Sequence, residues 1–89
     1  MGSNIQNNNK KNQGVSFPLA LAGAGEHVRI VMIRGGGKMK ERLLSIGLQV
    51  DDDVEIVQCR DKGAVLVAKE ENRFMLGGGM AQKIYVKKE

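Results

Sequence analysis

One segment of this chain has the periodicity of an α-helix, and its isolation limits the folds that the sequence can adopt. Within residues 38–46 the apolar side chains Met39, Leu43 and Ile46 recur at intervals of four and three, which places them on one helical face. Gly47 stands where a left-handed residue often ends a helix, and we expect Leu48 to fold back on the last turn. A chain with a single helix is unsuited to a parallel α/β sheet, because successive parallel strands need helical crossovers.

The remaining sequence consists of short segments with strand character, separated by turns. Val28, Ile30 and Met32 alternate onto one face of the first segment, and since Val31 and Ile33 are apolar too, we expect its far end to be covered on both sides. Residues 60–63 have the composition of a hairpin turn that ends in glycine. Residues 77–79 are all glycine and interrupt the pattern near the end. The spacing predicts a small, mainly β barrel of about five strands with one short inserted α-helix. The predicted strands are Glu26–Arg34, Val54–Cys59, Ala64–Lys69, Arg73–Leu76 and a last strand that begins at Ile84.

The amino-terminal residues differ in composition from the rest of the chain. Residues 1–16 are rich in asparagine and glutamine and poor in apolar side chains, so we expect a disordered tail before one domain over residues 17–89. No stretch reaches the ~18 apolar residues of a membrane span. A lone Cys59 excludes an internal disulfide. The sequence therefore predicts a small cytoplasmic protein without direct membrane insertion.

The formal net charge of +4 raises the question of nucleic-acid binding. Without Lys10 and Lys11 of the expected tail, twelve basic and ten acidic side chains remain, which gives a surface of mixed charge. Phe17, Phe74 and Tyr85 are the only aromatic residues, and they offer little material for stacking on bases. We therefore expect no nucleic-acid partner.

A glycine triplet between Arg34 and Lys38 has the composition of a phosphate-binding loop at a helix N-terminus. A P-loop requires serine or threonine directly after its lysine to hold magnesium, and Met39 occupies that position. A dinucleotide-binding fingerprint requires a further spaced glycine and a βαβ unit, and the sequence has neither. The triplet is better explained by a turn, or by the close approach of a neighbouring backbone.

Candidate residues for metal binding and catalysis are few. His27 is the only histidine and Cys59 the only cysteine, so the sequence predicts no closed zinc site. Glu26 with His27, or Asp51–Asp53, could hold a divalent ion such as ferrous iron weakly, but solvated surface is the favoured interpretation. Cys59 is expected to be a half-buried apolar residue. The sequence predicts no catalytic residue and no cofactor, and therefore a binding module rather than an enzyme.

Taken in order, these elements resemble the FeoA family, the small cytoplasmic proteins of bacterial ferrous iron uptake, over roughly residues 17–88. The residues that carry the resemblance are Pro18-Leu19, Gly25-Glu26, Ile33-Arg34-Gly35-Gly36, Arg42-Leu43-Leu44, Ile46-Gly47-Leu48, Val54, and the closing series Leu76, Ala81, Ile84 and Val86. The resemblance implies an SH3-like β-barrel whose helix is inserted between the first two long strands. Val50-Asp51 departs from the family's usual Pro-Gly. Residues 77–79 replace a charged helical turn, which predicts a loose segment.

The resemblance also implies a function, namely docking on the cytoplasmic part of the FeoB transporter, which itself carries the GTPase. We expect the docking surface on the glycine turn and the helix, where glycines admit another backbone and basic side chains add charge. The expected partner-binding residues are Arg34, Gly35, Gly36, Lys38, Lys40, Arg42 and Leu48. The alternative hypothesis is a domain that binds or senses divalent transition metal ions directly, as the related domains of metal-dependent repressors suggest.

Overall fold

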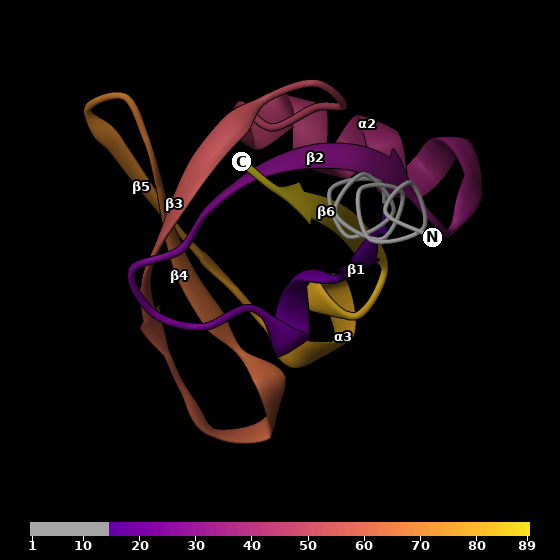
Figure 1. The fold of residues 1–89 in the computed structure, drawn as a ribbon. Helices are drawn as coiled ribbons and strands as arrows, with labels where there is room; N and C mark the ends of the chain where they lie inside the picture. Colours follow the sequence, from indigo (N-terminus) through magenta and orange to yellow (C-terminus); the bar gives the residue numbers. More distant parts are fainter. Residues whose placement is uncertain (1–14) are drawn as a thin grey trace, which may run out of the picture.

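The structure of the chain is a computed structural model that describes residues 15–89. A strongly curved sheet dominates it, and the helices lie in the connections between strands (Figure 1). The predicted disordered tail, residues 1–16, falls almost wholly outside the described residues. Residues 15 and 16 precede the first element and are exposed.

The described residues form one antiparallel sheet with the strand order β1-β6-β2-β3-β4-β5. The elements in chain order are β1 (Phe17–Pro18), the 3-10 helix η1 (Leu19–Leu21), β2 (His27–Ile33), α2 (Gly36–Ile46), β3 (Asp53–Cys59), the 3-10 helix η2 (Asp61–Gly63), β4 (Val65–Lys69), β5 (Asn72–Leu76), α3 (Gly78–Ala81) and β6 (Ile84–Lys88). The prediction of a mainly β fold with one inserted helix of several turns is confirmed.

The five predicted strands correspond to β2 through β6, and β1 is an additional short strand. Phe17 and Pro18 pair with Val86 and Tyr85, so β1 extends the sheet beyond β6. Within residues 15–89 no ladder joins β5 to β1. The sheet is therefore a curved, open barrel rather than a closed one.

The core lies on the concave side of the sheet and includes Val28, Ile30 and Ile33 from β2. The far end of β2 is not covered on both sides as predicted, because Met32 is 42% exposed, whereas Ile33 is buried. The pairing of β2 with β6 shifts register between Ile30 and Met32. Such a bulge adds one residue to one strand and moves the following side chains to opposite faces. The simple alternation along β2 therefore ends at Ile30.

Helix α2 begins two residues before the predicted start and ends where the sequence predicted. Gly47 has φ 109°, and the amide of Leu48 donates to the carbonyl of Leu43 at 2.9 Å, which is the bond of a Schellman motif. Met39 and Leu43 are buried as expected, but Ile46 is 42% exposed, against the prediction. Leu48, which the turn at Gly47 folds back, is the buried side chain at this end of the helix.

A lysine from the sheet fixes the carboxyl end of α2. The Nζ of Lys69 on β4 donates to the carbonyl oxygen of Gly47 at 2.8 Å and lies 2.9 Å from Oδ2 of Asp52. The same carboxylate accepts a 2.8 Å hydrogen bond from the amide of Gln49. A cation at this end of a helix interacts favourably with the helix dipole, and both charged groups are partly shielded from water. Lys69 thus connects the inserted helix to the strand opposite it.

Replacing Lys69 with methionine keeps the length of the side chain and removes its charge. We expect the Lys69→Met variant to lose about 1–2 kcal/mol of unfolding free energy, because a carbonyl and a carboxylate lose a charged donor. Urea denaturation followed by circular dichroism measures this loss. Lys87→Met is the matched control, since no ion pair of Lys87 occurs among the described residues, and we expect it to change stability by less than about 0.5 kcal/mol.

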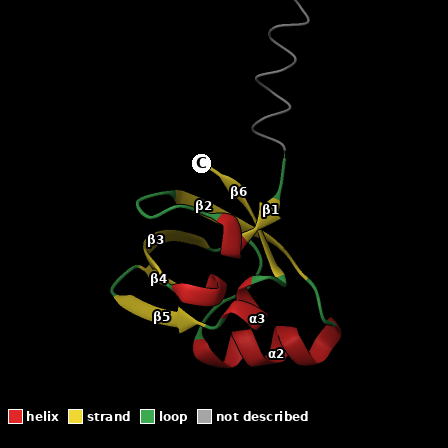
Figure 2. Cartoon of the chain, turned by 90° about the horizontal axis from the view of Figure 1, so that it is seen from below, coloured by secondary structure: helices red, strands yellow, loops and turns green. Residues whose placement is uncertain are grey.

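The second glycine triplet forms a helical turn instead of an irregular segment. Gly78–Ala81 is helix α3, and the amide of Ala81 donates to the carbonyl of Gly77 at 2.9 Å. A β-carbon on Gly78 would overlap the carbonyl oxygen of Lys62 in the β3–β4 turn. Gly78 therefore has a packing role, because only glycine allows these two backbones to approach so closely. Figure 2 shows α2 running along one side of the molecule.

Candidate functional site

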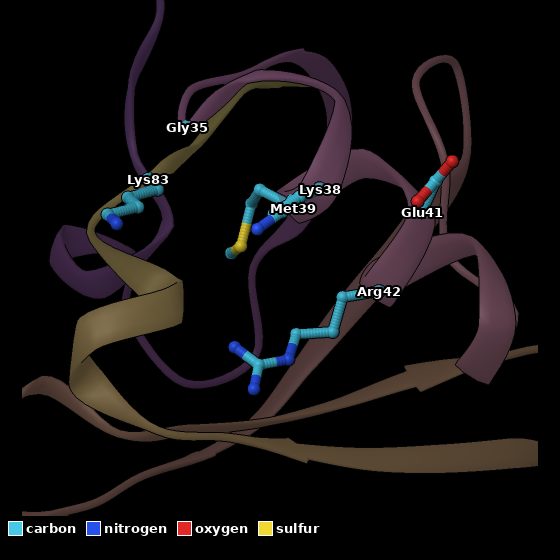
Figure 3. Close-up of a pocket in the computed structure, with 6 residues that line it drawn as sticks. All are labelled: Gly35, Lys38, Met39, Glu41, Arg42 and Lys83. Carbon is cyan, nitrogen blue, oxygen red and sulfur yellow. The ribbon is translucent and has the colours of Figure 1, made fainter.

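The outward side of α2 has a wide hollow at its amino-terminal half. We call this hollow the basic groove, and it has a volume of about 580 Å³. Figure 3 shows Lys38, Met39 and Arg42 on one side of the groove and Lys83 on the other, while Glu41 points away from them. The residues that line the basic groove are Gly35, Lys38, Met39, Glu41, Arg42 and Lys83.

Lys83 reaches the groove because β6 pairs with the end of β2. Ile33 on β2 is the register partner of Ile84 on β6, and the amide of Arg34 donates to the carbonyl of Lys83 at 2.8 Å. The residue just before β6 therefore lies beside the glycine turn that follows β2. Lys83 was missed in the sequence analysis, since no sequence pattern states which two strands are neighbours.

The groove is electropositive. Within residues 15–89, no carboxylate lies within ion-pair distance of Lys38, Arg42 or Lys83. The amino terminus of α2 has no side-chain cap, and its first turn contains no acidic residue. Lys38 and Arg42 are four residues apart on the helix, so the two positive charges share one face. The positive helix terminus and three basic side chains therefore combine, and Glu41, the one acidic residue that lines the groove, points away from them.

A second, smaller hollow lies on the other side of α2. We call it the apolar groove, and its volume is about 310 Å³. Leu44 is 56% exposed there, and Lys40 stands at its margin. Lys40 is two residues, or about 200°, from Lys38 around the helix, so the basic side chains of α2 are divided between two hollows. The residues that line the apolar groove are Ile33, Lys40, Leu44, Gln49 and Val50.

The other expected partner-binding residues have different environments. Arg34 is exposed and places its guanidinium carbon 5.4 Å from the centroid of the Tyr85 ring, a cation–π arrangement. Gly36 is exposed in the first turn of α2. Leu48 is completely buried, so its assignment as a surface contact is wrong. Its apolar side chain packs into the core next to the C-terminus of α2, and a partner cannot reach it in this structure.

Three of the residues weighed as metal ligands, Glu26, Asp52 and Asp53, have ion-pair partners within the chain. Glu26 accepts a 2.6 Å hydrogen bond from the amide of Gly23 and pairs with Lys88 at 2.8 Å, and the bond with Lys88 lowers the pKa of Glu26 most. Among residues 15–89, no group of three or more histidine, cysteine, aspartate or glutamate side chains is arranged to hold a metal ion. Cys59 is exposed, against the expectation of half burial, and its Sγ lies 3.2 Å from the carbonyl oxygen of Ala22.

Acidic side chains gather at the opposite end of β2 from the basic groove. Asp53 lies 3.0 Å from Nε of Arg29, and this hydrogen bond lowers the pKa of Asp53. The Asp53 carboxyl in turn raises the pKa of Glu89, which also pairs with Arg29 at 3.1 Å. His27, Asp53, Glu55 and Glu70 line a hollow at this end. This end of β2 is therefore of mixed charge, with Asp53 and Glu89 paired to Arg29, whereas the bases of the basic groove make no ion pair among the described residues.

No helix in the described part of the chain is long and apolar enough to cross a membrane.

Comparison with known proteins identifies relatives of nearly the whole described chain. The model of the FeoA domain family matches residues 17–88. A protein of Methanocaldococcus jannaschii, assigned as Fe(2+) transport protein A, is 30% identical over 70 residues, which cover 79% of this chain and 84% of that protein.

Solved structures with the same fold include an iron uptake regulatory protein and a transcriptional repressor. A crystal structure of an iron uptake regulatory protein (FeoA) has a TM-score of 0.77 and 27% identity, covering 84% of this chain and 100% of the other. A manganese-dependent transcriptional repressor has a TM-score of 0.75 and 24% identity, covering 83% of this chain but 42% of the repressor, so this similarity concerns the fold alone. The expected SH3-like fold is confirmed. With the family model matched over residues 17–88, the chain belongs to the FeoA domain family.

Proposed function

We propose that the chain is a non-enzymatic accessory protein of ferrous iron uptake that acts in the cytoplasm by docking on a FeoB-type transporter. The observation that carries this proposal is membership of the FeoA family over residues 17–88, together with a relative assigned as Fe(2+) transport protein A. Docking requires a stable surface and no bound cofactor. In this proposal ferrous iron is carried by the transporter, and the chain itself does not hold it as a cofactor.

The proposed docking surface is the exposed side of α2 with the glycine turn before it. Its residues, with the buried Leu48 now removed, are Arg34, Gly35, Gly36, Lys38, Lys40 and Arg42. Two hollows flank the helix, one basic and one apolar, so a partner would find both charge and apolar area there. Protein interfaces combine such an apolar patch with a polar rim. The link from Lys69 to Gly47 holds the helix in place, which reduces the ordering cost of binding.

The docking surface can be tested with the isolated cytoplasmic domain of the transporter. We expect the Lys40→Glu plus Arg42→Glu variant to bind this domain at least about tenfold more weakly than the parental chain, because two attractive contacts become repulsive. Arg73→Glu plus Lys87→Glu is the control. It changes the net charge of the chain by the same amount, but on strands β5 and β6 instead of helix α2. Binding measured by biolayer interferometry that is equal for the two double variants would refute the site, while absence of parental binding would refute the function.

Direct metal binding is the alternative that a second measurement separates from docking. Titration calorimetry of the full chain with ferrous or manganous ion measures the affinity without any partner. Micromolar binding that disappears in His27→Ala would favour a metal-sensing domain. We expect no such binding, because no group of three or more histidine, cysteine, aspartate or glutamate side chains in residues 15–89 is arranged to hold a metal ion.

A further inference from the structure

The ion pairs of the described residues are unevenly distributed. They join Arg29 to Asp53 and Glu89, Lys69 to Asp52, and Lys88 to Glu26. The three cations of the basic groove, Lys38, Arg42 and Lys83, take part in none of them. They come from two separate elements, and the backbone bond between Arg34 and Lys83 holds these elements together. The convergence of the three charges is therefore a fixed property of the fold.

The isolated chain bears an electrostatic cost at this groove. Lys38 lies in the first turn of α2, where the positive end of the helix dipole disfavours a cation. Arg42 is four residues further along, a spacing at which like charges repel each other. A negatively charged group bound between them relieves both repulsions. The sequence thus retains an arrangement that is unfavourable in the free chain and favourable in a complex with an anionic partner.

The shape of the groove favours a short acidic peptide segment over a long polyanion. Met39 lies between the basic side chains at the floor of the groove, where it is almost wholly buried. The opposite end of β2, about 20 Å away, carries Asp53, Glu55 and Glu70 beside the cations Arg29, Lys87 and Lys88. A polyanion that extends beyond the groove therefore gains no further surface that is basic alone. A segment with two or three carboxylates meets only the basic part of the surface.

We infer that the basic groove binds a short acidic segment of the transporter's cytoplasmic part, with its carboxylates held by Lys38, Arg42 and Lys83. This inference rests on the proposed function, since the segment is assigned to the transporter. It adds Lys83 to the docking surface and gives the chemistry of the partner. It also makes binding dependent on salt, because the contacts are exposed ion pairs.

The first test is the Lys38→Glu plus Lys83→Glu variant, titrated with the transporter's cytoplasmic domain. We expect its affinity to fall at least about tenfold, and the Arg73→Glu plus Lys87→Glu control to bind within about twofold of the parental chain. All four side chains lie outside the buried core, so the variants should fold alike, which thermal denaturation checks. If the Lys38→Glu plus Lys83→Glu variant binds with the affinity of the parental chain, the inference about the basic groove is wrong, while the proposed function remains.

The second test needs no transporter and therefore separates the two proposals. The full chain, labelled with ¹⁵N, is titrated with a capped triglutamate peptide, and amide shifts are followed by NMR. We expect saturable shifts at Gly35, Lys38, Met39, Arg42 and Lys83, and their loss in the Lys38→Glu plus Lys83→Glu variant. Shifts that map elsewhere would overturn the inference. Equal binding of octathymidylate at these residues would overturn it too, by assigning the groove to nucleic acid.

Discussion

Replacing Leu43 with alanine is expected to lower the free energy of unfolding by about 2–5 kcal/mol, whereas the same change at Leu44 is expected to alter it by less than about 0.5 kcal/mol. Leu43 is completely buried in the core, and Leu44 is 56% exposed at the apolar groove. The two variants have identical composition and nearly identical helix propensity. Their difference therefore isolates the burial of one side chain from α2.

The measurement is equilibrium unfolding in urea for both variants, with the slope of the transition compared as well as its midpoint. An unchanged slope shows that Leu43→Ala weakens the packing of α2 without releasing the helix from the sheet. A loss below about 1 kcal/mol would contradict the structure, because it would mean that α2 does not pack against the core through Leu43. The Leu44→Ala variant also serves the docking proposal, since it changes the apolar groove while keeping the fold.

Much of the fold could be predicted because local patterns decide it. The apolar spacing of Met39 and Leu43 defines the buried face of α2, and Gly47 ends the helix by its positive φ. Met32 could not be placed, since a bulge in the pairing with β6 reverses its direction. Bulges arise from the match of two strands, and a single strand's sequence does not contain that information. The predicted burial of Ile46 was wrong for a related reason, because the tertiary context leaves this side chain at the surface.

The candidate site was predicted less completely than the fold. Lys38 and Arg42 could be assigned from the sequence, because a spacing of four residues puts them on one helix face. Lys83 could not, since its position beside Gly35 depends on the pairing of β2 with β6. Leu48 was assigned to the surface, although the Schellman turn that the sequence also predicted buries it. Residues joined by tertiary pairing are those that sequence analysis misses.

The Gly78→Ala variant is expected to lose about 3 kcal/mol of unfolding free energy. The added β-carbon would overlap the carbonyl oxygen of Lys62, and both atoms belong to backbone segments that cannot move aside as a flexible side chain does. Helix α3 would have to separate from the β3–β4 turn to accept it. Because Gly78 has no positive φ, the loss would come from the contact and not from backbone strain.

Gly79 provides the control for this interpretation, since it is the next residue of the same helix. A β-carbon on Gly79 would meet no atom within 4 Å, so Gly79→Ala is expected to raise the free energy of unfolding by about 0.4–1 kcal/mol through reduced chain entropy. Thermal and urea denaturation of the two variants should thus give shifts of opposite sign. If both alanines stabilise the protein, α3 does not pack against the β3–β4 turn, and residues 77–79 are the loose segment that their composition alone suggested.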